Sequence, residues 1–401
     1  MQFDYHYLLD LAIILLTTKI FGLITRRLHM PQVVGALIAG IVFGPLLLNV
    51  LTQTVFIKQL SELGVIMIMF TAGLSTNLNE LRQTGKAGLV VALIGVVVPL
   101  AGGMGVGFIF NHDSPKALME NIFLGTVLTA TSVSITVETL KEMGKLNTKV
   151  GSTILAAALI DDVLGLICLT VVSSFSGDAA AAANANVVIV LLKILAFFVL
   201  AIGFGFIAIK GLNWYAVKLG RSNLQRFHLF AFIICLLMAF AAEHFFGVAD
   251  IIGAFAAGLI IGNTLGAPYM EQRFHPLSYL LLTPVFFASL GLSIQRTTMN
   301  LQLILFTVAL LAMAVLSKLV GCGVGAKLCG MTKKESIQVG FGMVCRGEVA
   351  LIVANKGMAA GVVPPEFFGP IIVLVVFCSV VTPILLKMSF KGAETLPEVR
   401  E

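Results

Sequence analysis

Charged residues are scarce in this chain. Only 11% of its 401 residues are Asp, Glu, Lys or Arg, whereas 58% are hydrophobic, and the mean hydropathy is +1.02. A soluble domain of ordinary composition carries about 25% charged residues, most of them on its surface. The scarcity of charge therefore excludes a soluble globular protein and places the chain in a membrane.

Two further absences narrow the function. No polar stretch is long enough to form a separate catalytic or nucleotide-binding domain, so one membrane domain fills the sequence. The six cysteines show neither the spacing of metal ligands nor a pairing pattern. Basic residues exceed acidic residues by 26 to 20, but contact with anionic headgroups of the lipid bilayer accounts for this excess, so no nucleic-acid partner is needed.

Hydrophobic stretches of about 18 to 25 residues recur along the chain, which is the length that crosses a bilayer as a helix. We therefore expect an all-α membrane protein with about thirteen transmembrane helices. The expected spans are residues 7–26, 31–50, 56–75, 86–110, 119–139, 148–174, 186–209, 224–242, 248–265, 275–294, 301–326, 335–359 and 366–388.

The basic loop residues predict the orientation, because Lys and Arg collect on the cytoplasmic side of a membrane. With thirteen spans, only four basic loop residues fall on the opposite side: Lys58, Lys116, Arg296 and Lys356. We expect a multi-pass protein of the cell membrane, inner or plasma, with its N-terminus outside and its C-terminus in the cytoplasm.

An internal repeat relates the two halves of the chain. Three pairs of Gly-rich segments match at one offset of 218 positions: 34–44 with 252–262, 73–75 with 291–293, and 103–107 with 321–325. Small-residue helix faces produce one such match by chance, but three at one offset favour a duplication.

The duplication predicts the domain organisation. Residues 1–174 form a first repeat of six spans, 175–222 a linker with span seven, 223–390 a second repeat of six spans, and 391–401 a cytoplasmic tail. Because the linker crosses the membrane once, the two repeats have inverted topology. Inverted repeats are typical of secondary transporters, whose substrate site lies near the middle of the membrane where discontinuous helices of both repeats meet.

A pair of acids marks the candidate site. Asp161 and Asp162 lie in the middle of the apolar run 154–167. Carboxylates at this depth cost several kcal/mol even after partial neutralisation, so they indicate an ion or proton site. Consecutive helical residues project about 100° apart, so one acid can face water while the other meets a neighbouring helix. Lys318, deep within span eleven, is too far from either end to reach water and needs such a partner.

Two segments are candidates for interrupted helices. Residues 128–137 cluster β-branched and hydroxyl side chains of modest helix propensity, and residues 340–350 are rich in glycine and contain Arg346 and Glu348. The two segments correspond under the offset of 218. Arg346 and Glu348 are suited to neutralise opposed helix-dipole ends at a crossing of the two breaks. The alternative is an ion pair within one helix that only holds span twelve together.

Four motifs together resemble a known family. Segments 131–134, 160–162, 318–326 and 342–350 are similar in order and spacing to the monovalent cation:proton antiporters, in the second branch with bacterial sodium/proton exchangers and Kef-type potassium efflux systems. The resemblance implies the sodium/proton antiporter fold, in which a core domain with crossed discontinuous helices moves against a dimerisation domain. It also implies a homodimer.

The resemblance further implies a role for each matching residue. Asp162 is the principal carboxylate, which binds either the cation or a proton. Asp161 is a second titrating acid whose salt-bridge partner is Lys318, and Thr131 and Ser132 line the ion site in the first unwound segment. Asp162, Thr131 and Ser132 then supply the oxygen ligands that suit a monovalent metal cation.

The predicted function is secondary active antiport, in which Na⁺ or Li⁺ is exchanged for protons by alternating access, with a role in pH homeostasis. The protein is then not an enzyme, needs no cofactor, and carries Na⁺ or K⁺ and H⁺. The main alternative is K⁺/H⁺ exchange in the same fold. Kef-type members typically have glutamine at the position of Asp161 and a soluble nucleotide-binding domain, both of which are missing here.

Two other classes fit less well. An intramembrane aspartyl protease needs two acids that converge from separate helices onto one water, whereas Asp161 and Asp162 are neighbours. A cation channel with a carbonyl filter needs a sequence such as Thr-Val-Gly-Tyr-Gly, which the chain lacks.

Overall fold

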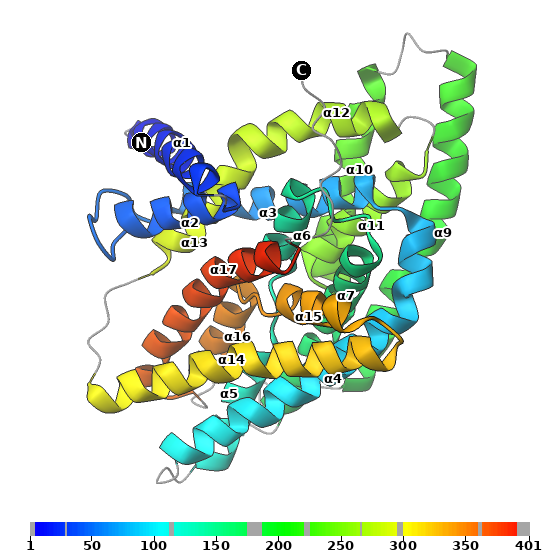
Figure 1. Cartoon of the computed structure of the whole chain (residues 1–401). Coiled ribbons are helices and arrows are strands. Elements are labelled where there is room, and N and C mark those ends of the chain that lie inside the picture. Colours follow the sequence, from blue (N-terminus) through cyan, green and yellow to red (C-terminus); the bar gives the residue numbers. More distant parts are fainter. Residues whose placement is uncertain are drawn as a thin grey trace.

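The regular secondary structure of the chain is helical. The computed structural model describes residues 5–28, 30–111, 116–174, 187–219, 225–264, 267–294, 300–359 and 363–390, and every regular element in these ranges is a helix (Figure 1). The predicted tail 391–401 and the alanine-rich segment 175–186 at the start of the predicted linker lie outside the described residues.

Most helices lie on the expected spans, although three of them extend eight to ten residues beyond the expected bound at one end. The first half contains α1 (His6–Arg27), α2 (Gln32–Phe43), α3 (Val55–Ser75), α4 (Leu78–Phe110), α5 (Ala117–Thr129), α6 (Val133–Glu142) and α7 (Lys149–Ser174), and α9 (Val187–Leu219) follows it. The second half contains α10 (Gln225–Phe246), α11 (Asp250–Gly262), α12 (Ala267–Leu277), α13 (Thr283–Leu292), α14 (Leu301–Leu328), α15 (Lys333–Gly342), α16 (Glu348–Ala359) and α17 (Phe368–Phe390). A π-helical turn, Ser278–Leu282, joins α12 to α13.

Ten helical segments among the described residues are long and apolar enough to cross a membrane. The apolar helices α2 and α11 are shorter, with 12 and 13 residues. Span two was expected to reach residue 50, but α2 ends at Phe43, because Gly44 and Pro45 follow and the chain turns back there. The N–H groups of Val50 and Leu51 donate to the carbonyl of Phe43. The count of thirteen spans stays a prediction.

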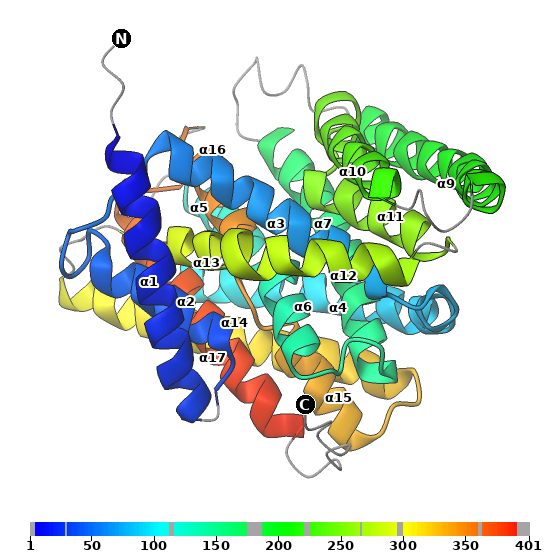
Figure 2. The same cartoon turned by 90° about the horizontal axis from the view of Figure 1, so that it is seen from above.

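In space the helices form two groups that each take members from both halves of the chain (Figure 1). The core group is α4 to α7 with α14 to α17, and α4 packs along α14 at its centre. The panel group is α1 to α3 with α10 to α13, in which α3 packs on α11 and α2 on α13. The helices α9 and α10 lie at the edge opposite α1 (Figures 1 and 2).

Close helix crossings in the panel group repeat the offset seen in the sequence. Gly40 of α2 lies against the backbone of Ala288 in α13, and Gly258 of α11 lies against the backbone of Phe70 in α3. The two contacts are equivalent under the repeat, because Gly258 follows Gly40 by 218 positions and Ala288 follows Phe70 by 218 positions. A Cβ atom at either glycine would overlap that backbone, so the crossings require glycine. These matching contacts support the predicted repeat.

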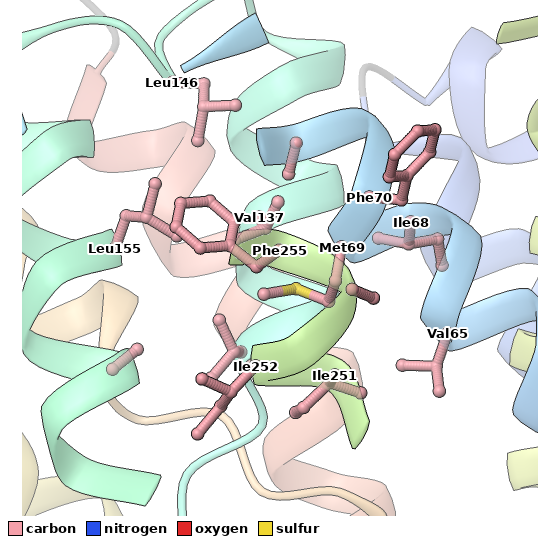
Figure 3. Close-up of a cluster of buried hydrophobic side chains, with 14 of the residues drawn as sticks. Val65, Ile68, Met69, Phe70, Val137, Leu146, Leu155, Ile251, Ile252 and Phe255 are labelled. Carbon is pink, nitrogen blue, oxygen red and sulfur yellow. The ribbon is translucent and has the colours of Figure 1, made fainter. Parts of the chain in front are cut away.

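The core and panel groups meet through apolar side chains. Figure 3 shows Met69 and Phe70 of α3 and Phe255 of α11 from the panel, together with Val137 of α6 and Leu155 of α7 from the core, all of them buried. At one end of this boundary the contacts are polar, because Lys141 Nζ of α6 donates to Thr71 Oγ1 of α3 over 3.0 Å. The boundary is therefore largely apolar.

Candidate functional site

The first interruption divides span five. The helix α5 ends at Thr129, α6 starts at Val133, and the three residues between them are not helical. Thr131 Oγ1 donates to the carbonyl of Thr129 over 3.4 Å, and the hydroxyls of Ser132 and Ser134 are 3.3 Å apart. All of these side chains are buried. The hydroxyl-rich sequence thus satisfies its own polar groups where the helix is broken.

The second interruption divides span twelve. The helix α15 begins with a capping box, in which Thr332 Oγ1 accepts from the N–H of Glu335 and Glu335 Oε2 accepts from the N–H of Thr332. It ends at Gly342, and α16 starts at Glu348. Residues 343–347 form the break, inside the predicted segment 340–350. The first break likewise lies inside the predicted segment 128–137.

The two breaks are in direct contact. The N–H of Ser132 donates to the carbonyl of Cys345 over 3.0 Å, and Thr136 Oγ1 donates to the carbonyl of Gly342 over 2.8 Å. A Cβ atom on Gly347 would lie 2.6 Å from Ser132 Oγ, so only glycine fits there. The interrupted spans therefore cross at their breaks, as the sequence predicted.

Arg346 joins the C-terminal ends of the two half-helices. Its side chain is fully buried, and Nη2 donates to the carbonyl of Leu128 near the end of α5 over 2.7 Å. Nη1 donates to three carbonyls just beyond α15, those of Met343, Val344 and Cys345, over 3.0 to 3.2 Å. Both helix ends carry unsatisfied carbonyls and a partial negative charge, which one guanidinium compensates.

Glu348 is the first residue of α16, at the helix end where the dipole is positive, but its side chain lies outside the described residues. Its predicted part in charge compensation is therefore untested. The four hydrogen bonds of the Arg346 guanidinium all go to backbone carbonyls.

The acid pair lies on α7. Asp161 and Lys318 are both buried, and Lys318 Nζ is 2.9 Å from Asp161 Oδ1. Asp162 is also buried, with 7% of its surface exposed, and projects about 100° away around the helix. The helix α7 touches the end of α15, next to the second break, because a Cβ atom on Gly342 would lie 2.5 Å from Ile154 Cδ1. Ile154 precedes Asp161 by seven residues, about 10 Å along the helix axis.

The structure thus joins Asp161 to Lys318, and Ser132 and Arg346 to the crossing. Three contributors were missed by sequence reasoning. Ser379 of α17 donates to the carbonyl of Arg346 over 2.6 Å, and Thr136 bridges the breaks. Gly95 of α4 leaves room for Cys322, one turn after Lys318 on α14, because a Cβ atom at Gly95 would lie 2.5 Å from Cys322 Sγ. Of these three residues, only Thr136 could have been predicted from the sequence, because it belongs to the hydroxyl-rich segment 128–137.

Known proteins share both the sequence and the architecture. Residues 12–391 match the family described as sodium/hydrogen exchanger, transmembrane. The chain is 39% identical over 392 residues to the Na(+)/H(+)-K(+) antiporter GerN of Bacillus cereus, with 97% of each chain covered. It is 34% identical over 379 residues to a Na(+)/H(+) antiporter of Enterococcus hirae, with 94% of this chain and 96% of the relative covered.

The fold is that of a solved archaeal protein. The sodium proton antiporter MjNhaP1 from Methanocaldococcus jannaschii superposes with a TM-score of 0.70 at 17% identity, over 99% of this chain and 100% of the other. A second structure of MjNhaP1, at pH 8, gives a TM-score of 0.66 over 96% of each chain.

Proposed function

Since the chain belongs to the sodium/hydrogen exchanger family, we propose that it is a secondary active antiporter that exchanges Na⁺ or Li⁺ for protons by alternating access. The observation that carries the proposal is the buried acid pair of α7, with Asp161 bonded to Lys318 and the helix itself packed against the crossing of two interrupted spans. Relatives over nearly the whole chain bear the names of Na⁺/H⁺ antiporters.

Asp162 holds the transported ion in this mechanism. Its carboxylate binds either Na⁺ or a proton, and the hydroxyls of Thr131 and Ser132 supply further oxygen ligands for the dehydrated cation. Binding of Na⁺ expels the proton, and binding of a proton expels Na⁺. The exchange is obligatory because the empty site carries a charge that opposes movement through the apolar boundary, whereas the occupied site is neutral.

Asp161 and Lys318 form the second element of the mechanism. The ammonium group neutralises Asp161 while Asp162 is occupied, and protonation of Asp161 releases Lys318. This pair allows more than one proton to be exchanged for each cation. Arg346 serves a different purpose, since it fixes the two helix ends at which the ion site is built.

Alternating access requires the core group to move against the panel group. Because the two groups meet mainly through apolar side chains, the movement breaks few hydrogen bonds.

We place the protein in the cell membrane as a homodimer whose panel groups meet, with its N-terminus outside. We assign it to the second branch of the monovalent cation:proton antiporters, on the four motifs quoted above.

K⁺ is the second candidate substrate. One relative, 39% identical, has K⁺ as well as Na⁺ in its name. The experiment is a cation panel in proteoliposomes that contain a pH-sensitive dye and an imposed pH gradient. We expect Na⁺ and Li⁺ to dissipate the gradient, K⁺ to act weakly, and Asp162→Asn to abolish the response. Full activity of Asp162→Asn would contradict the mechanism, and a K⁺ response equal to that of Na⁺ would establish the second candidate.

A further inference from the structure

A cavity of about 230 Å³ lies between the core and panel groups, away from the acid pair of α7. Its walls come from α1, α2 and α13 of the panel and from α6 of the core. Most of its lining surface is apolar, with contributions from Val33, Ala36 and Phe287, but seven of the thirteen lining residues have polar side chains. Two acids of α6, Glu138 and Glu142, also line it, and the proposed ion-binding residues do not.

Glu138 is buried in the inner wall of this cavity. Only 7% of its surface is exposed, and its Oε2 atom has no hydrogen-bond partner among the described residues. The nearest basic residue on its own helix, Lys141, donates to Thr71. A buried carboxylate with an unsatisfied oxygen is costly, and a bound cation or a proton removes that cost.

Lys141 and His275 attract the Glu138 carboxylate through space, but no basic group around the cavity is in direct contact with it among the described residues. Lys19 is exposed and its Nζ lies 5.7 Å from the ring centre of Tyr279, whose hydroxyl donates to Gln32 Oε1 over 2.9 Å. His275 is exposed and stacks on Tyr279. No ion pair joins Glu138 to any of these bases in the part of the chain that the structure describes.

Glu142 lies one helical turn from Glu138 on the same face of α6, about 6 Å along the axis. It is exposed, and its Oε2 accepts from the N–H of Gln32 at the start of α2 over 2.9 Å. The two acids thus lead from the surface into the cavity. The same helix begins at Val133, directly after Ser132 of the first break, so the buried acid lies six residues, about 9 Å along the axis, from that break.

We propose that this cavity is a second binding site for the transported alkali cation, with Glu138 as its carboxylate ligand and water as the remaining ligands. A volume of 230 Å³ holds a cation with several waters. In this proposal the hydrated cation binds at Glu138 first, then loses its bound water molecules and moves along α6 to the first break. The assignment rests on the proposed function, since only a cation carrier has a use for a staging site.

Cation binding at Glu138 can be measured without transport. Dicyclohexylcarbodiimide modifies buried, protonated carboxylic acids, and a bound cation prevents the reaction. Purified protein is treated with the reagent in NaCl or in choline chloride, and modification of Glu138 is quantified by mass spectrometry. We expect Na⁺ to lower the modification severalfold in the wild type and equally in Asp162→Asn. Modification that does not respond to Na⁺ would show that Glu138 holds only a proton and would overturn the proposal.

Transport provides the second measurement. Glu138→Gln is expected to raise the apparent KM for Na⁺ about tenfold, the usual effect of losing one charged ligand, with little change in the maximal rate. Glu138→Asp keeps the carboxylate and should restore most of the affinity. Glu62→Gln, at an exposed glutamate of α3 outside the cavity, is the matched control. If the reagent does not reach Glu138, an unchanged KM in Glu138→Gln overturns the proposal instead. If the wild type does not transport Na⁺, the proposed function is contradicted, whereas the effect of Na⁺ on modification of Glu138 remains a separate result.

Discussion

Arg346 and Lys318 are both completely buried, yet the two regions neutralise their charges differently. The guanidinium of Arg346 is held by four backbone carbonyls at the crossing of the breaks. The ammonium of Lys318 is held by the carboxylate of Asp161, between α14 and α7. Carbonyls do not titrate, whereas a carboxylate does. The comparison therefore separates a permanent charge, held at Arg346 by backbone carbonyls, from an exchangeable charge, held at Lys318 by a side chain that the proposed mechanism protonates.

The largest effect is expected at the permanent charge. Arg346→Met leaves the carbonyls of two helix ends buried and unpaired, which costs on the order of 4 kcal/mol of unfolding free energy. Arg346→Lys keeps the charge but cannot span both helix ends, so an intermediate loss is expected. Thermal unfolding in detergent measures both. A Met variant as stable as the wild type would remove the structural role of Arg346.

The stability lost by removing the exchangeable charge of Lys318 should be recoverable by a second substitution, because its partner is the side chain of Asp161. Lys318→Met leaves Asp161 buried and unpaired and should cost about 3 kcal/mol. Adding Asp161→Asn removes the orphaned charge and should recover most of the lost stability, although not the transport. A double-mutant cycle measures the coupling between the two positions. Additive losses would mean that the 2.9 Å contact contributes nothing.

The close approach of the breaks predicts a smaller loss. In Gly347→Ala the new methyl group would lie 2.6 Å from Ser132 Oγ and push the two breaks apart. We expect a cost of about 1–3 kcal/mol and reduced transport. Gly105→Ala is the matched control, because that glycine is within α4 and no atom lies within 4 Å of an added Cβ. Equal unfolding temperatures for the two variants would contradict the close crossing.

The smallest change in stability is expected at the hydroxyl of the first break. Ser132→Ala keeps the backbone bond to Cys345 and loses only a 3.3 Å contact between hydroxyls, so the loss should be about 1 kcal/mol or less. If the hydroxyl is an ion ligand, the apparent KM for Na⁺ rises nonetheless. Sodium-dependent dissipation of a pH gradient tests this, and an unchanged KM would remove Ser132 from the ion site.

Much of this organisation could be predicted from the sequence. Hydrophobic length gave the helix positions, hydroxyl and glycine clusters located both breaks, and the family resemblance paired Asp161 with Lys318. These signals are local or belong to motifs. The signal for the end of α2 at Phe43 is also local, since Gly44 and Pro45 follow directly. The sequence prediction missed this end because the residues after Pro45 are apolar and extend the hydrophobic stretch.

Other features could not be predicted because their partners are distant or are backbone atoms. Every residue has a backbone carbonyl, so the sequence does not indicate which carbonyls Arg346 binds. One of them belongs to Leu128, which is 218 residues away and so corresponds to Arg346 under the repeat. The cavity around Glu138 needs helices from both halves of the chain to be in place. Glu138 alone resembles any acid of a membrane protein near a helix end.

Competition between Na⁺ and a proton at Asp162 is tested most directly by proton release. Purified protein in weakly buffered detergent solution is titrated with NaCl while a pH indicator records the free protons, with choline chloride as the control. We predict that Na⁺ releases protons from the wild type and that Asp162→Asn removes most of this release. Binding of Na⁺ without proton release, or equal release from Asp162→Asn, would contradict the account.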